Sequence, residues 1–457
     1  MILSSLLYLL PLWILGFEIV CIIWPGELLR ELPLKLMLAL GVGPGIGSCL
    51  HFLYLTIIGS DPVIINWVVY ILCILFAYIL IRRNVVLPHK SEIHLFMPNI
   101  GERLLLAIFL FAFVVLVAGF FALMFTRPQG TFDAYAIWNL KARFMYLDPE
   151  HWIRAFSPEL NWKTHPDYPL LVPLNVLRLW QSVGQATPRA SALIAANFTF
   201  GLVGIAAALI YSLRDASLAA IGGILMAATP AMITIGTAQT ADLPLAYFIL
   251  ACSLLLYKEI RDDQPRILFL VGLLGGFAAW TKNEGSVFVV LVIMASIILW
   301  RRTPRKLVWF GSGLLLPISV LILFKLRYAP PGDLLVSQTL SELLIKITDI
   351  DRYAVIIRSL ATNLLTVGGW KIPILPILLV IMLIIFRKDS KENKPWLVLS
   401  VLSVLTMAGY CAVYLVTPHP LEWHLNYSMD RLVLQIFPLL TCLLLLRMKS
   451  PSEIWKQ

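Results

Sequence analysis

Charged side chains are scarce in this sequence, and their scarcity limits the class of protein that it encodes. Only 14% of the 457 residues are charged, whereas 60% are hydrophobic and the mean hydropathy is +0.85. Soluble globular proteins carry about 25% charged residues, so a soluble fold is excluded. The chain also lacks the short alternating segments of a membrane β-barrel. The composition therefore predicts an all-α, polytopic transmembrane protein without a separate soluble domain.

Cysteines and a cleavable leader are the next features in short supply. No two cysteines have the CxxC spacing of metal-binding or redox sites. The N-terminus has neither a basic region nor a small-residue cleavage site, so we expect residues 2–23 to form a retained membrane helix. The six cysteines lie in apolar runs, where we expect them to pack without disulfides: Cys21, Cys49, Cys73, Cys252, Cys411 and Cys442.

The basic residues do not form a contiguous face, although the net charge is +10. They lie in short groups between apolar runs, as in Arg82-Arg83, Arg301-Arg302 and Arg387-Lys388. A surface that binds nucleic acid would be contiguous and would contain aromatic residues, so we expect no nucleic-acid partner. Such groups are instead typical of loops that stay on the cytoplasmic side of a membrane.

About thirteen apolar runs approach the roughly 20 residues that a helix needs to cross a bilayer. They are 2–23, 36–58, 63–81, 104–125, 190–211, 216–232, 243–257, 267–280, 286–300, 307–324, 372–386, 395–416 and 431–446. One more run, 169–183, is short and is interrupted by Pro169, Pro173 and Arg178. We expect this run to stay on the outer side, either at the membrane interface or continuing into the next helix.

The charges of the loops favour this topology. If 169–183 does not cross, the regions that face the cytoplasm hold about 21 Lys and Arg, against about two in the short loops on the other side. These regions are 24–35, 82–103, 212–215, 258–266, 301–306, 387–394 and the C-terminal tail. The sequence thus predicts a plasma (inner) membrane protein with about thirteen crossings, its N-terminus outside and its C-terminus inside.

Two outer loops are long and contain amphipathic segments. Residues 126–189 include "WNLKARFMY", and residues 325–371 include "LSELLIKITDIDRYAVIIRSLATNLL". Both patterns suit helices that lie at the membrane surface. We divide the chain into an N-terminal three-helix extension with a basic cytoplasmic loop (1–103), a transmembrane core (104–324) and a C-terminal part with an outer loop and further membrane helices (325–457).

Ionisable residues collect on the predicted outer side, where they come from several separate loops. Such convergence on one face is typical of a functional site. The candidates are Asp133, Lys141, His165, Asp167, Asp242, Lys282, Glu284, His424, Asp430 and Arg431. Each also has a structural explanation. These alternatives are helix N-caps for Asp133 and Asp242, a solvated pair for Lys282 and Glu284, a plain loop for His165, and interface anchors beside Trp423 for His424 and Arg431.

Asp133 and four later segments carry a resemblance to a known family. The segments are "WNLKARFMY", "HPDYPLLVPL", "AQTADLPLAYFILA" and "GLLGGFAAWTKNEG". Together they resemble the GT-C superfamily of polytopic membrane glycosyltransferases, in particular its branch of protein O-mannosyltransferases and aminoarabinose-lipid A transferases. The resemblance covers about residues 104–300, and "EWHLNYSMDRLVLQIFP" resembles a C-terminal motif of bacterial members.

The resemblance implies a hexosyl- or pentosyltransferase that takes a sugar from a polyprenyl-phosphate donor on the extracytoplasmic side. Members carry a catalytic acid in the first large outer loop, which corresponds to Asp133, and an Asp at the start of a later helix, which corresponds to Asp242. Many members have two acids in the first loop, whereas here Ala134 follows Asp133. We therefore assign no metal ligands and leave a divalent cation as an open alternative.

This chemistry agrees with the residue types on the outer side. A carboxylate, Asp133, would take the proton of the attacking acceptor hydroxyl as general base. The phosphate leaving group needs no general acid, and a single displacement would invert the anomeric centre. Nearby positive charge would stabilise the phosphate, and the remaining candidates would orient sugar hydroxyls. The candidate cations are Lys282, Arg431, Lys141 and Arg143.

Other functions stay open at this point. They are a transporter or flippase of lipid-linked sugars, a polymerase or ligase of lipid-linked oligosaccharides, and a structural membrane subunit. A transporter would carry charges near the membrane midplane and broken helices in repeated halves, and the sequence contains no evident internal repeat. The sugar, the polyprenol and the acceptor, whether glycan, lipid or protein, are not determined by the motifs.

Overall fold

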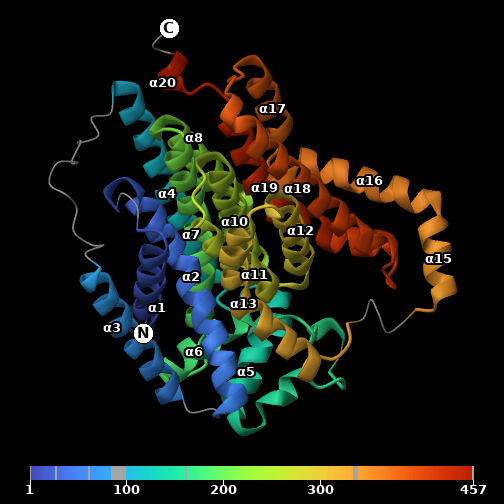
Figure 1. Cartoon of the computed structure of the whole chain (residues 1–457). Coiled ribbons are helices and arrows are strands. Elements are labelled where there is room, and N and C mark those ends of the chain that lie inside the picture. Colours follow the sequence, from blue (N-terminus) through green and yellow to red (C-terminus); the bar gives the residue numbers. More distant parts are fainter. Residues whose placement is uncertain are drawn as a thin grey trace.

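The computed structural model describes residues 2–25, 28–59, 62–83, 99–160, 162–332 and 338–454, and these ranges are almost entirely helical (Figure 1). They contain no strand beyond one isolated bridge between Phe386 and Met448, which confirms the all-α prediction. The helices are α1 (Ile2–Ile23), α2 (Leu28–Ile57), α3 (Pro62–Arg82), α4 (Ile100–Thr126), η2 (Ala134–Trp138), α5 (Asn139–Leu147), η3 (Pro149–Phe156), η4 (Trp162–Thr164), α6 (Leu171–Val183), α7 (Pro188–Leu213), α8 (Ala216–Ala227), α9 (Pro230–Thr234), α10 (Asp242–Asp262), α11 (Ile267–Thr281), α12 (Asn283–Trp300), α13 (Pro304–Arg327), α15 (Leu340–Thr348), α16 (Ile350–Leu365), η5 (Val367–Gly369), α17 (Ile374–Ile384), α18 (Ser390–Leu415), α19 (Leu421–Leu446) and α20 (Pro451–Ile454).

Within the described part of the chain, nine helices are long and apolar enough to cross a membrane. A tenth is counted if Ile350–Gly369 and Ile374–Ile384, which meet at 89°, form one span. Three shorter apolar helices, Tyr8–Ile23, Ala216–Ala227 and Ile267–Thr281, coincide with other predicted spans. The chain is thus a multi-pass membrane protein, and the number of thirteen crossings stays a prediction.

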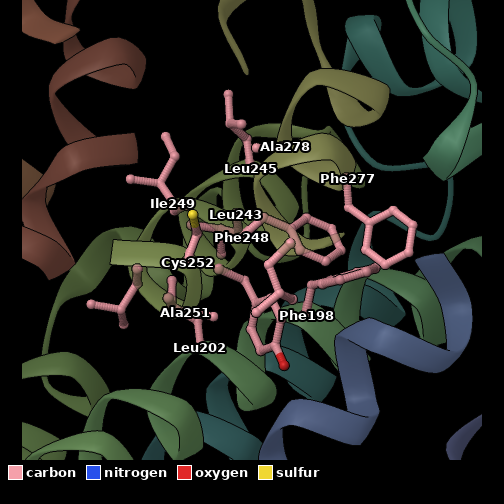
Figure 2. Close-up of a cluster of buried hydrophobic side chains, with 14 of the residues drawn as sticks. Phe198, Leu202, Leu243, Leu245, Phe248, Ile249, Ala251, Cys252, Phe277 and Ala278 are labelled. Carbon is pink, nitrogen blue, oxygen red and sulfur yellow. The ribbon is translucent and has the colours of Figure 1, made fainter. Parts of the chain in front are cut away.

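Helix α10 lies at the centre of the bundle and is buried on all sides from Asp242 to Glu259. A helix that is apolar around its whole circumference is typical of a core position. Figure 2 shows Phe198 of α7, Phe248 of α10 and Phe277 of α11 in one cluster, with ring centroids 5.6 and 5.7 Å apart along the series. This packing places the first turn of α10 in the interior at one end of the bundle.

The loops that the charge distribution assigned to the cytoplasm do lie together. Ion pairs join them in the structure: Lys258 to Glu31 (3.6 Å), Arg214 to Glu453 (2.9 Å), Arg261 to Glu392 (3.6 Å) and Lys306 to Glu259 (2.6 Å). Each pair connects residues of the predicted inner regions. Of the basic loop 82–103, residues 84–98 lie outside the described ranges. The α20 end of the molecule, which carries Glu453, is opposite the α5 end in Figure 1.

The short run at 169–183 forms α6, which is enclosed by other helices. Its residues from Leu171 to Trp180 are all buried, and it packs against α2, α5 and α7. Its 13 residues span about 20 Å, less than the roughly 30 Å of a hydrocarbon core. Neighbouring helices, α2 and α7 among them, cover the apolar side chains of α6, and its place on the outer side of the membrane stays a prediction.

Two other outer segments also differ in detail from the prediction. Residues 417–431 were predicted as a loop, but α19 begins at Leu421 and continues the membrane helix outward. The segment "WNLKARFMY" is helical as expected, yet one face of α5, with Asn139, Lys141 and Met145, is buried. By contrast, α15 has no buried residue and α16 has only Ile356, which agrees with an amphipathic arm that extends from the bundle (Figure 1).

Helices α11 and α13 touch backbone to backbone through glycine. A Cβ added at Gly313 would lie 1.9 Å from the carbonyl oxygen of Phe269, whereas one at Gly311 would meet nothing within 4 Å. Small residues allow such close approach between membrane helices. The same helix therefore contains one essential glycine and one dispensable glycine.

We predict that Gly313→Ala lowers the stability of the protein by about 1–3 kcal/mol, because the methyl group forces the two helices apart. Gly311→Ala is the matched control and should be neutral or slightly stabilising, because alanine has the higher helix propensity. Thermal unfolding of both purified variants measures the difference. Equal unfolding temperatures for the two variants would contradict the close α11–α13 contact.

Candidate functional site

Asp242, the first residue of α10, is the centre of a buried network of ion pairs and hydrogen bonds. Its side chain has no exposed surface. Its Oδ1 accepts from Lys282 Nζ at 3.0 Å and from Gln435 Nε2 at 2.8 Å. Its Oδ2 accepts from Arg431 Nε at 2.8 Å and from Thr240 Oγ1 at 2.9 Å. Two cations and two neutral donors thus compensate a charge that would be costly to bury alone.

Arg431 connects this buried carboxylate to a second one. Its Nη1 donates to Oδ2 of Asp133, while its Nη2 lies 2.8 Å from Oδ2 of Asp242. The Asp133 side chain keeps 27% of its surface exposed, against 0% for Asp242. Of the two carboxylates, only Asp133 is accessible to a substrate.

The turn between α11 and α12 supplies the other cation. Lys282 lies 3.0 Å from Asp242 and 2.7 Å from Oε1 of Glu284, and only 5% of the residue is exposed. Burial disfavours its charge, but the two carboxylates outweigh burial and raise the pKa of Lys282. The explanation as a solvated surface pair is therefore wrong, since Lys282 is enclosed.

Neither aspartate caps a helix. The Asp133 backbone is already helical and its side chain makes no capping hydrogen bond, and Ala241 rather than Asp242 precedes α10.

Asp133 is followed by the π-helix η2, a local insertion that often occurs at functional sites. Upstream, a Cβ at Gly130 would lie 2.6 Å from the carbonyl of Ala238. This close approach holds the Asp133 segment against the loop that leads into Asp242.

A second polar cluster lies next to the first. Asn283 Nδ2 donates to Oδ2 of Asp167 at 2.8 Å, and Lys325 Nζ donates to Oδ1 of Asn283 at 2.9 Å. Lys325 also donates to the main-chain oxygen of Asp167 at 2.6 Å. Because Lys282 and Asn283 are neighbours in sequence, one turn ties Asp167 to the Asp242 network.

Lys141 and His165 belong to the wall of this second cluster. Lys141 is 1% exposed, lies over the rings of Trp138 and Tyr168 at 5.8 and 5.9 Å, and donates to two main-chain oxygens. Burial lowers its pKa to about 7, although Asp167 acts to raise it. His165 stacks on Tyr168 with ring centroids 4.5 Å apart. Neither side chain contacts Asp133, Asp242 or Arg431 among the contacts of the described residues.

His424 and Asp430 do not join the Asp242 network either. His424 Nδ1 lies 2.8 Å from the hydroxyl of Thr417, and its ring packs edge-on against Tyr414. Asp430 is exposed and accepts only from the backbone N–H of Arg431 among its described hydrogen bonds. Successive helical residues point about 100° apart, so Arg431 faces Asp242 while Asp430 faces away.

Several residues of the site were not selected from the sequence. Gln435 lies one turn beyond Arg431 and is the lone amide in an apolar stretch, and Lys325 is a cation near the predicted outer end of α13. Isolated polar groups in membrane helices often mark functional sites, so both carried a usable signal.

Comparison with known proteins adds one finding. A family model described as dolichyl-phosphate-mannose-protein mannosyltransferase matches residues 176–324, about a third of the chain. The match indicates a membrane glycosyltransferase of the GT-C type. This confirms the resemblance proposed from the motifs. The matched stretch contains Asp242, Lys282 and Glu284 but neither Asp133 nor Arg431. No curated protein and no solved structure matches the chain.

The arrangement of acidic and other potential ligand side chains bears on metal binding. Among the described residues, no group of three or more His, Cys, Asp or Glu side chains is arranged to hold a metal ion. Asp133 and Asp242 both face the guanidinium of Arg431. The position between the two carboxylates is therefore taken by a side-chain cation.

We predict that Asp242→Asn lowers stability by about 3 kcal/mol or more, because the buried ion pairs with Lys282 and Arg431 are lost and the amide NH2 group faces hydrogen-bond donors from which it cannot accept. Asp430→Asn, an exposed change on α19, is the control and should have little effect. Thermal unfolding of the two variants in detergent compares them. Equal stability of Asp242→Asn and the parent chain would contradict the buried network.

We also predict a pH dependence that comes from Lys141. Its pKa is about 7 in the folded chain and 10.5 in the absence of burial, so between these values the unfolded state binds more protons and stability rises with pH. From pH 7 to 9 this contribution is at most about 3 kcal/mol. Lys141→Met lacks it, so the stability of the parent relative to this variant should increase over that range. A pH-independent difference in unfolding temperature would refute the assignment.

Proposed function

We propose that this chain transfers a sugar from a polyprenyl-phosphate donor to an acceptor hydroxyl, with Asp133 as the general base. The observation that carries the proposal is the pairing of an accessible carboxylate, Asp133, with a buried and charge-compensated one, Asp242, through Arg431. Asp242 has no surface free for substrate and positions the cations. Asp133 has the exposure that a base acting on an external acceptor needs.

The donor phosphate would bind beside Arg431 and Lys282, the two cations of the network. Phosphate prefers bidentate contact with a guanidinium, and positive charge stabilises a phosphate leaving group. A phosphate that takes up part of the Arg431 guanidinium would also weaken its hold on Asp133. The carboxylate oxygen released in this way would be available to accept a hydrogen bond from the acceptor hydroxyl.

The reaction would be a single displacement. The acceptor oxygen attacks the anomeric carbon, its proton passes to Asp133, and the bond from that carbon to the phosphate oxygen breaks, so the configuration inverts. The polyprenyl chain requires an apolar surface, and Phe132 and Tyr135 flank Asp133 with half-exposed rings 5.2 Å apart. The description of the matched family names a lipid-phosphate sugar as donor, and we extend only this class of donor to the chain.

We place the reaction on the extracytoplasmic side of the plasma membrane. The short loops that carry Asp242, Lys282 and Arg431 contain about two Lys and Arg, whereas the ion-paired loops that include Lys258 and Arg214 hold many more basic residues. In the proposed division of the chain, residues 104–324 supply Asp133, Asp242 and Lys282, and residues 325–457 supply Arg431. Of residues 1–103, none that the structure describes contributes to the network.

We predict that Asp133→Asn folds and inserts normally but loses transfer by about 10²–10⁴-fold, the usual contribution of a general base. Release of polyprenyl phosphate from a polyprenyl-phosphate sugar, measured in membranes that contain the chain, is the readout. Asp148→Asn is the control, because Asp148 is a more exposed acid of the same loop that pairs only with His151 and Arg154 among described residues. Undiminished transfer by Asp133→Asn would refute the assignment of the base.

A further inference from the structure

The first turns of α19 present an exposed face that the proposed reaction does not use. Trp423 is 41% and Tyr427 65% exposed, and their rings pack with centroids 5.1 Å apart at a tilt of 42°. Asn426 and Asp430 are also exposed. Positions i, i+3, i+4 and i+7 share one side of a helix. Two aromatic rings, an amide and a carboxylate thus form one continuous surface, which we name the α19 face.

An aromatic pair elsewhere in the chain shows what a lipid-facing surface looks like here. On α3, Trp67 is 61% exposed and packs edge-on against Tyr70 at 6.0 Å. The exposed neighbours on that helix are Ile64, Ile71 and Ile74, so the whole surface is apolar. Aromatic residues in such surroundings are typical of the membrane interface.

The α19 face differs because its aromatic rings have polar neighbours. A carboxylate and an amide are costly against hydrocarbon, so Asp430 and Asn426 do not suit a lipid-facing surface. The same combination suits a saccharide, since the flat C–H face of a pyranose packs on an aromatic ring and its hydroxyls bond to carboxylate and amide groups. The composition of the face therefore distinguishes sugar from lipid.

The α19 face leads directly to the candidate base. Arg431 follows Asp430 and donates to Asp133, and Arg431 lies eight positions after Trp423, which corresponds to about 12 Å along the helix. The end of α18 and the turn that leads into α19 are also held in place. Lys346 and Arg352 of the α15–α16 arm donate to the main-chain oxygens of Thr417 and Tyr414 at 2.9 and 2.8 Å. A surface positioned by such contacts is suited to binding.

We propose that the α19 face is the acceptor subsite and that the acceptor is a saccharide, with one pyranose ring on Trp423 and Tyr427 and its hydroxyls on Asn426 and Asp430. This inference rests on the proposed glycosyltransferase function and adds the chemical class of its acceptor. The next ring toward Arg431 would then present its hydroxyl to Asp133.

Saccharide binding in the absence of donor tests the inference without requiring transfer. We would record saturation-transfer-difference NMR spectra of maltotriose, mannotriose and cellotriose with the purified full chain in nanodiscs. The parent chain should saturate ring C–H protons of at least one of these sugars. The double variant Trp423→Ala/Tyr427→Ala should lower that signal about five-fold or more, and Trp423→Phe/Tyr427→Phe should largely restore it.

Two control variants separate this inference from the proposed function. Trp67→Ala, which removes the lipid-facing tryptophan of α3, should leave the saccharide signal unchanged. Asp133→Asn should also keep it, because the base is not required for binding. If the parent gives no signal with any of the sugars, or if the double alanine variant gives an equal signal, the α19 face is not a saccharide site. Retained transfer by Asp133→Asn would refute the catalytic proposal alone.

Discussion

A single buried carboxylate, that of Asp242, constrains how the end of the bundle that holds the candidate site is built. It lies at the start of a helix that is buried from Asp242 to Glu259, so water cannot solvate it. Its charge must therefore be compensated by side chains from other segments, and Lys282, Arg431, Gln435 and Thr240 fulfil this need. The turn between α11 and α12, the polar start of α19 and the loop before α10 are fixed relative to one another as a result.

Arg431 connects the buried Asp242 to a carboxylate at the protein surface. One edge of its guanidinium binds the enclosed Asp242, and the other binds the accessible Asp133. An exposed ion pair between two flexible side chains contributes little to stability, because pairing costs conformational entropy. The guanidinium of Arg431 is already held by Asp242, so it loses little further conformational entropy when it pairs with Asp133. This arrangement holds a carboxylate at the outer end without enclosing it, which is what a base facing two separate substrates requires. The opposite end of the bundle uses ion pairs differently, since they connect basic loops to one another and to Glu453.

Much of the candidate site could be predicted from the sequence, because its residues were grouped by the predicted membrane topology. Asp133, Asp242, Lys282 and Arg431 all stand at predicted outer helix ends, so the placement of the spans brought them to one side before any packing was known. The direction in which each residue points from its helix could not be predicted in the same way. Asp430 and Arg431 are adjacent in sequence, yet only Arg431 turns inward, and His424 faces Thr417 instead of the carboxylates. Gln435 and Lys325 joined the site through tertiary packing that no local pattern specifies.

The fold shows the same division between what composition determines and what packing determines. Apolar runs located the long helices, but they did not reveal that α6 is enclosed by its neighbours, nor that α19 extends ten residues beyond its predicted start at residue 431. Short helices such as α11 are buried from Ile267 to Thr281, so bilayer thickness does not set their length. This is why the number of crossings cannot be read from helix length alone.

The central claim is that a lipid phosphate binds beside Arg431 and Lys282, next to Asp133. The most direct test is a cryo-electron microscopy map of the full chain in nanodiscs with a polyprenyl phosphate, in which the position of the phosphorus is measured. We expect the phosphate within hydrogen-bonding distance of Arg431 or Lys282. A phosphate at the opposite end of the bundle, beside Arg214 or Arg387, would contradict the account.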